Sequence, residues 1–206
     1  MDRAPYEVLF TKWLSFEKVQ KLKRIEEMVE LYYNSNQFRH TLRFLEGAFS
    51  SAFRMYEALA EYYEEQGYVV NSPARSYRYQ VLLSFACRWD GDTDAIYREL
   101  LTHDMYLREN LKSRPAFGKD LRDYKEIIRG MYRREEAERR LLPEYRDYDS
   151  KQLEKMTHVE PYHYSVWELP QDGKVQVLDA PVYLLYDYKE RCPLTGEARV
   201  VRVECL

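Results

Sequence analysis

Glycine is scarce in this 206-residue chain, which holds only 7 glycines beside 20 tyrosines. Few glycines disfavour a fold made of many tight turns, and a charged fraction of 33% favours long, solvent-exposed helices. Lys plus Arg number 32 against 35 Asp plus Glu, a net charge of −3, so the basic excess typical of a dedicated nucleic-acid-binding protein is missing. A hydrophobic fraction of 45% supports a buried core and excludes wholesale disorder.

Cysteine is also scarce, and long apolar runs are absent. The three cysteines, Cys87, Cys192 and Cys205, are odd in number and too widely scattered for a disulfide framework or for the spacing of a zinc or iron–sulfur site. No run of about 18 apolar residues is available to span a membrane, and the N-terminus lacks the pattern of a secretion signal. The simplest compartment is therefore the reducing cytoplasm.

Helical periodicity fills the first two thirds of the chain. Apolar residues recur at helical spacing in about six segments, of which the first runs from Ser15 to Asn34. Ser15 is the expected N-cap of that helix, and Gly67 stands where a C-terminal cap is expected for the third one. Asp120 is expected to begin the sixth helix, whose second half, Arg133 to Arg140, is almost purely charged.

The pattern changes after Pro143 to the alternation that is typical of β-strands. The expected turn and strands are the alternating residues Tyr162 to Trp167, a hairpin at Asp172-Gly173, a strand from Val182 to Tyr188 and a returning strand from Arg199 to Glu204. We predict an α+β fold, with an N-terminal helical bundle of about six helices followed by a small antiparallel β-sheet. The predicted division is a linker over 1–14, a helical domain over 15–145 and a β subdomain over 150–206 packed on the helices.

Signatures of nucleotide binding, of zinc proteases and of a nucleophilic serine are missing from the sequence. One metal hypothesis comes from His158, Glu160 and His163, which are close in sequence and carry ligand-type side chains. Polar side chains on a strand or loop are the commoner outcome of such a pattern. The residues themselves therefore predict no catalytic group and no metal site.

The densest polar stretch runs from His103 to Pro115. On a helix, Asp104 and Arg108 lie one turn apart and can pair. A loop after the helix would allow the guanidinium of Arg114 to bind a carboxylate or a phosphate. The functional hypothesis is a substrate- or partner-binding surface made of Tyr106, Arg108, Asn110, Lys112 and Arg114. A solvated helix end with intrahelical pairs is the alternative.

Several segments resemble parts of a known protein family. Pro5–Leu9, Ser15–Phe16 and Leu22–Ser35 are similar to the end of the catalytic region of bacterial cobalamin-binding radical SAM proteins. The segments that follow are similar to the domain of unknown function at the C-terminus of one subgroup of those proteins: Phe38–Leu45, Tyr106–Pro115, Tyr186–Tyr188 and Pro193–Thr195.

This resemblance implies that the chain follows a cobalamin-binding domain and a radical SAM partial barrel in a longer polypeptide. The parent protein would use a 4Fe-4S cluster, S-adenosylmethionine and cobalamin. The cluster-binding Cys-x-x-x-Cys-x-x-Cys and the cobalamin-associated Asp-x-His-x-x-Gly are both absent from this chain. We therefore expect the parent to be the enzyme, and we expect neither catalysis nor a bound cofactor from this fragment.

The expected function is that of a C-terminal accessory domain, which packs on the catalytic barrel of the same polypeptide and assists substrate binding. Phe16, Leu31 and Tyr33 lie outside the main apolar stripe of the first helix, so residues 5–33 are expected to contact that barrel or a second copy in a dimer. A free-standing helical protein-interaction module and an RNA-binding appendage are the alternatives. The charge balance argues against a nucleic-acid partner, and no membrane partner is expected.

Overall fold

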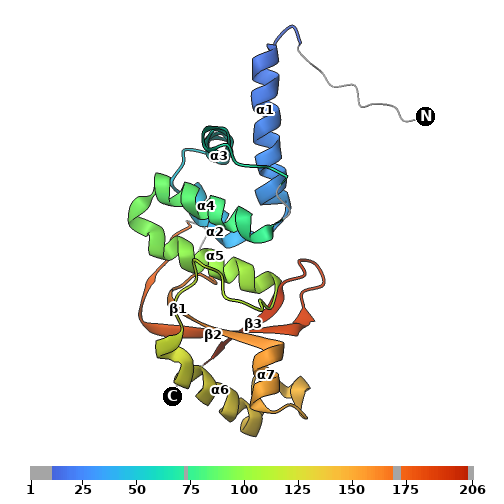
Figure 1. Cartoon of the computed structure of the whole chain (residues 1–206), viewed down its shortest axis with the longest axis vertical. Coiled ribbons are helices and arrows are strands. Elements are labelled where there is room, and N and C mark those ends of the chain that lie inside the picture. Colours follow the sequence, from blue (N-terminus) through green and yellow to red (C-terminus); the bar gives the residue numbers. More distant parts are fainter. Residues whose placement is uncertain (1–10, 72–73, 169–172, 204–206) are drawn as a thin grey trace, which may run out of the picture.

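A computed structural model describes residues 11–71, 74–168 and 173–203 of the protein. Helices come first and an antiparallel sheet comes last (Figure 1), so the predicted α+β class is confirmed. Most of the expected N-terminal linker, together with Asp172 of the expected hairpin, lies outside the described residues.

The first half of the chain folds into helices that follow one another closely. They are α1 (Phe16–Met28), the π-helix η1 (Val29–Asn34), α2 (Arg39–Glu46), α3 (Ala52–Gln66), α4 (Arg75–Trp89) and α5 (Asp94–Arg108). Ser15 caps α1 by accepting the backbone N–H of Lys18, and Gly67 ends α3 with a left-handed φ of 65°. Both caps confirm the sequence-based prediction.

Two further helices, α6 (Lys125–Glu138) and α7 (Ser150–Met156), bring the α-helices of the described residues to seven, so the prediction of about six is wrong by one. The missed helix is α7, a short helix inside the region assigned to strands. Its capping box was the available signal: Asp149 accepts from the backbone of Gln152, and the side chain of Gln152 binds back to Asp149. Asp120 precedes a short 3₁₀ turn, Arg122–Tyr124, rather than α6 itself.

Three strands form one antiparallel sheet in the order β1 (Thr157–Tyr164), β2 (Val177–Arg191) and β3 (Ala198–Val203). The strand predicted from Val182 to Tyr188 is part of the longer β2, which begins before Pro181 and continues through it. The register between β1 and β2 shifts between Tyr162 and Tyr164 of β1, and Pro181 lies in the part of β2 that faces this shift. A proline is tolerated there because the regular ladder of hydrogen bonds is already interrupted.

The sheet lies between helices on both faces (Figure 1). Alternate residues of β2 point to opposite sides, so Leu184 and Tyr186 pack with the core around α5, whereas Tyr183 and Leu185 pack with Ile128 of α6. The protein therefore has two hydrophobic cores separated by the sheet. Within the described residues no helix combines the length and the apolarity that crossing a bilayer requires.

Candidate functional site

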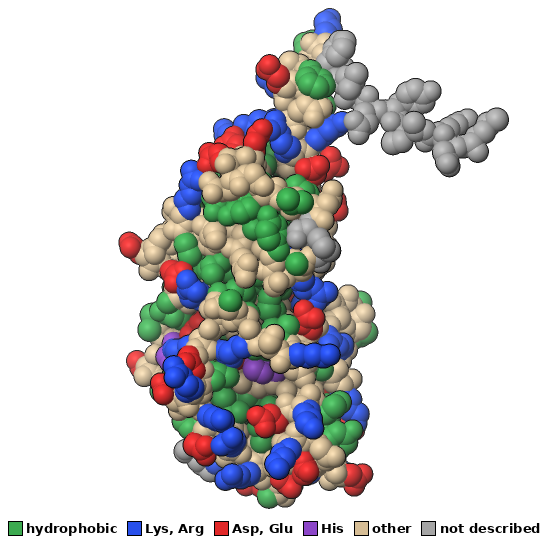
Figure 2. All heavy atoms as spheres, in the orientation of Figure 1, with side chains coloured by type: hydrophobic (Ala, Val, Ile, Leu, Met, Phe, Trp, Pro, Cys, Tyr) green, Lys and Arg blue, Asp and Glu red, His purple; other side chains and the backbone are tan. Residues whose placement is uncertain are grey.

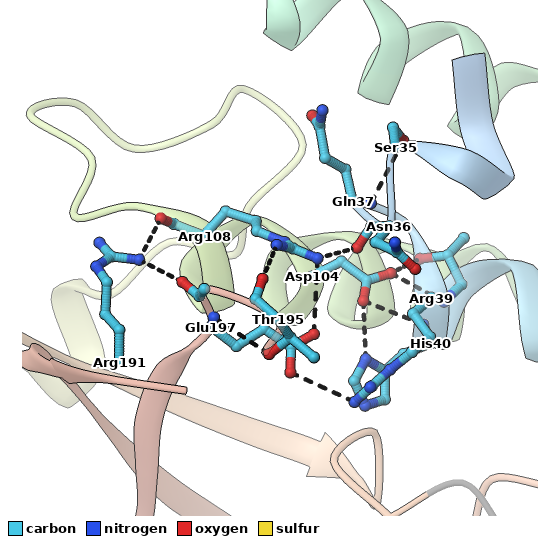
Figure 3. A network of polar contacts seen from close by, with 12 residues as sticks. Ser35, Asn36, Gln37, Arg39, His40, Asp104, Arg108, Arg191, Thr195 and Glu197 are labelled. Atoms are coloured by element: carbon cyan, nitrogen blue, oxygen red, sulfur yellow. Dashed lines mark hydrogen bonds and ion pairs between the residues drawn. The ribbon is translucent and has the colours of Figure 1, made fainter. Parts of the chain in front are cut away.

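The N-terminus of α2 is capped from a distance by Asp104 of α5 (Figure 3). Phe38 occupies the N-cap position of α2 and has no oxygen with which to cap the helix. The buried carboxylate of Asp104 replaces that cap: it accepts the backbone N–H groups of His40 (3.1 Å) and Thr41 (2.9 Å) and the hydroxyl of Thr41 (2.7 Å). Nδ1 of His40 lies 2.8 Å from the same carboxylate, so the imidazole ring is held in one orientation.

The same network continues to the turn between β2 and β3 (Figure 3). Arg108, one helical turn after Asp104, donates to the carbonyl oxygens of Asn36 and of Thr195, the latter at 2.6 Å. Its guanidinium also lies 3.7 Å from the carboxylate of Glu197. Arg108 therefore fastens α5 both to the segment that precedes α2 and to the sheet.

A hollow of about 900 Å³ opens beside this network, and we call it the η1 hollow. Its walls come from η1, α2, the start of α3 and the residues that follow β1. The lining residues are Val29, Tyr32, Tyr33, Asn36, Arg39, His40, Leu42, Arg43, Glu46, Ala52, Phe53, Met55, Tyr56, Trp167 and Glu168. Its volume lies within the range of small-molecule sites, about 300–1,000 Å³.

The backbone that borders the η1 hollow is unusual in two places. Val29–Asn34 forms a π-helix. This conformation is rare in proteins, and where it occurs it is often at a functional site. Asn36, two residues later, has a φ of 54°, which asparagine tolerates better than most residues. Both features carry a conformational cost, and strained backbone of this kind gathers at ligand sites and switch regions.

Beneath the hollow, a buried histidine–tyrosine chain joins α5 to the sheet. Nδ1 of His103 lies 2.6 Å from the hydroxyl of Tyr186, which lies 2.6 Å from the hydroxyl of Tyr162. Burial, followed by the nearby charge of His40, holds the pKa of His103 well below its usual range. His103 is therefore a neutral, hydrogen-bonded part of the core.

The predicted surface of five residues is divided among separate contacts. Tyr106 is buried, and its ring stacks on that of His158 with 3.6 Å between the ring centroids. Its carbonyl oxygen also accepts the hydroxyl of Tyr188 at 2.8 Å. Tyr106 is thus a packing residue between α5 and the sheet, while Arg108 belongs to the network of Figure 3.

The remaining three of the predicted residues lie after α5. Asn110 donates to the carbonyl oxygen of Lys155 at 2.8 Å, and Lys112 is exposed. Arg114 binds both carboxylate oxygens of the buried Glu160, a bidentate pair that anchors the loop to β1. The five side chains are therefore not gathered around one cavity.

The metal hypothesis for β1 is not supported by the geometry. His158 lies 2.8 Å from Glu160, but His163 pairs with Glu99 of α5 at 3.1 Å and lies 3.0 Å from Nζ of Lys119. Burial raises the pKa of Glu99. Among the described residues, no group of three or more His, Cys, Asp or Glu side chains is placed to hold a metal ion.

Sequence reasoning missed His40 and the η1 hollow. His40 is an isolated histidine in the sequence, and the residue that orients it is 64 positions away. The one local signal was the absence of a capping side chain at Phe38, directly before the helical segment. Such an absence predicts a distant cap without identifying it.

Apolar side chains are uncovered along α1 and at the start of α3. Trp13 is 81% exposed and Tyr33 63% exposed, and Phe16, Leu22 and Phe53 are also exposed. Figure 1 shows α1 projecting from the body of the molecule. Figure 2 shows the face of the molecule seen in Figure 1. On this face, hydrophobic side chains are most evident between α1 and α5, whereas charged side chains predominate around α6.

The comparisons with known proteins give a family but no activity. No curated protein and no solved structure matches the chain. A family profile matches residues 1–184, which include every described helix, β1 and the first half of β2. The chain belongs to the family described as protein of unknown function, DUF4080.

Proposed function

We propose that this chain is the C-terminal accessory domain of a cobalamin-dependent radical SAM enzyme. Its α1 packs on the catalytic barrel of the same polypeptide, and the η1 hollow faces the substrate. The proposal combines the sequence resemblance with one structural observation, the uncovered apolar surface of α1. No catalytic role is assigned to any residue of the chain.

The exposed surface of α1 is the observation that carries the proposal. Within α1, only Ile25 and Met28 are buried, and both lie in its second half. The first half is flanked by Trp13 and includes Phe16 and Leu22, all three of them exposed. Several large apolar side chains left in water on one helix and directly before it make this segment a candidate interaction surface.

The contacts that hold α1 to the rest of the chain are mainly with α3, and several of them are surface ion pairs. Lys21 lies 2.7 Å from Glu57 and 3.0 Å from Glu61, and Arg24 pairs with Glu64. Exposed pairs contribute little to stability, because water screens them and ordering the side chains costs entropy. A second surface against the uncovered side of α1 would bury its apolar residues.

The test uses the complete reading frame that contains this chain. We expect an upstream Cys-x-x-x-Cys-x-x-Cys, one iron–sulfur cluster per polypeptide after anaerobic reconstitution, and none on the 206-residue chain alone. In the complete protein, the double variant Trp13→Ser/Phe16→Ser should lower the thermal midpoint and the turnover of S-adenosylmethionine.

The matched control is Leu194→Ser in the complete protein, because Leu194 is 94% exposed but lies in the turn between β2 and β3, away from α1. It should leave both measurements unchanged. A reading frame without the cysteine motif would overturn the proposal and favour a free-standing interaction module. Equal effects of the double variant and the control would refute docking through α1.

A further inference from the structure

We infer that the η1 hollow binds a small aromatic molecule that carries both an ammonium and a carboxylate group, as an aromatic amino acid does. This inference rests on the proposed function for the role of that molecule as substrate. Binding itself depends only on the walls of the η1 hollow. It is therefore testable on the isolated chain.

The aromatic part of the ligand is indicated by the walls. Tyr33, Phe53 and Trp167 come from three separate segments and line the same hollow. Tyr33 and Phe53 expose half or more of their surface, so covering them with a flat aromatic group would remove apolar area from water. Ring–ring contacts of this type add about 0.5–1.5 kcal/mol each beyond the area that they bury.

The two charges are indicated by α2 and by the residue after Trp167. The lining holds two cations, Arg39 and Arg43, one helical turn apart, and two anions, Glu46 and Glu168. A wall with balanced charge disfavours a ligand with a net charge and suits one with both signs. Arg43 and Glu46 lie 3.5 Å apart with both side chains about half exposed, and exposed pairs of this kind contribute little to stability.

The edge of the η1 hollow is already ordered in the free chain. Asp104 fixes Nδ1 of His40, and Nε2 of the same ring makes no hydrogen bond to any described residue. The side chain of His40 is 10% exposed and lines the hollow, so Nε2 is the ring nitrogen left to accept a hydrogen bond from the ligand. Because the imidazole is fixed before binding, its ordering entropy is not lost on association.

L-phenylalanine is the probe, titrated into the isolated chain by calorimetry and by ligand-observed NMR. We expect saturable binding with a dissociation constant in the range of about 10 μM to 1 mM. Phenethylamine, which lacks the carboxylate, and 3-phenylpropionate, which lacks the ammonium, should each bind about tenfold more weakly or worse. Equal binding of all three compounds would overturn the assignment of an amphoteric ligand.

Variants place the binding in the η1 hollow. Phe53→Ala and Arg43→Gln should each weaken binding about tenfold, while the control Leu194→Ala should leave it unchanged. Absence of binding at about 10 mM probe, or binding that Phe53→Ala does not affect, would refute the inference. The double variant Trp13→Ser/Phe16→Ser should abolish docking on the barrel and leave binding of L-phenylalanine unchanged. The experiment can therefore refute either proposal without the other.

Discussion

The contacts of α5 with α2 and with the sheet differ from the surface of α1 in which side chains they leave without a partner. At the α5 contacts, polar groups are buried and paired: Asp104 with α2, and His103 with Tyr186 of the sheet. On α1 and directly before it the reverse holds, because apolar side chains such as Phe16 and Trp13 are exposed to water. The α5 contacts are complete within one chain, whereas the proposed function assigns a partner to the α1 surface. We therefore assign structural roles to the first region and a binding role to the second.

The largest expected effect is on the cap of α2. Asp104→Ala removes a buried carboxylate that accepts several hydrogen bonds. The backbone N–H groups of His40 and Thr41 then lose their acceptor. The free energy of unfolding, measured in urea, should fall by about 3 kcal/mol or more. Asp92→Ala, on the exposed turn before α5, should change it by less than about 0.5 kcal/mol. Equal effects would show that Asp104 is not the cap of α2.

A smaller effect is expected from the hydroxyl of Tyr186, which lies at the centre of the buried histidine–tyrosine chain. Tyr186→Phe keeps the ring but removes the partner of His103 and of Tyr162. Leaving buried polar groups unpaired should lower the free energy of unfolding by about 1–3 kcal/mol. Tyr33→Phe, which removes a hydroxyl from an exposed ring, serves as the control and should have almost no effect. If the two variants lower the free energy of unfolding equally, the buried histidine–tyrosine chain does not stabilise the interface.

The pH dependence of stability tests the same interface. The pKa of His103 is depressed in the folded state, so the unfolded chain binds more protons than the folded one below the ordinary histidine pKa of about 6.5. The cost of keeping His103 neutral is absent well above that pH, and it grows as the pH falls below it toward the depressed pKa of the folded state.

His103→Gln isolates this contribution, because the other ionisable groups are common to both proteins. Below about pH 6.5 the free energy of unfolding should fall more steeply with falling pH in the unmodified chain than in the variant, by up to about 1.4 kcal/mol per pH unit. His40 on α2 and the hydroxyls of Tyr162 and Tyr186 face the ring and stay in place in the variant. Parallel pH curves would mean that His103 is not buried in its neutral form.

The smallest effect belongs to the exposed surface. Trp13→Ser in the isolated chain should change the free energy of unfolding by less than about 0.5 kcal/mol, since an 81% exposed side chain buries little area. Urea denaturation is the measurement. A loss of about 1.5 kcal/mol or more would show that Trp13 stabilises the chain on its own, and the contrast between the two regions would fail.

The parts of the fold that could be predicted are those that local sequence determines. Ser15 and Gly67 were identified because capping depends on the residue itself and on the backbone beside it. The short α7 was missed because seven residues hold too few turns to show a period. The only sequence signal for this helix was its capping box, the pair Asp149 and Gln152.

The candidate site was mostly beyond sequence reasoning. The segment Tyr106–Arg114 was noticed for its polar side chains, but their partners, among them Glu160 and Thr195, lie far away in sequence. His40 could not be identified from the sequence, because nothing nearby predicts its contact with Asp104. Local pattern identifies which residues can bind, whereas tertiary packing decides whether they bind a ligand or the chain itself.

The most direct test of the central claim is amide hydrogen exchange in α1, measured on the isolated chain and on the complete reading frame. We predict that amides of Phe16–Met28 exchange at least about tenfold more slowly in the complete protein, because a partner surface covers the helix. Amides of Asp94–Arg108 in α5 should exchange alike in both, since that interface is complete within the chain. Identical exchange of α1 in the two proteins would contradict the account.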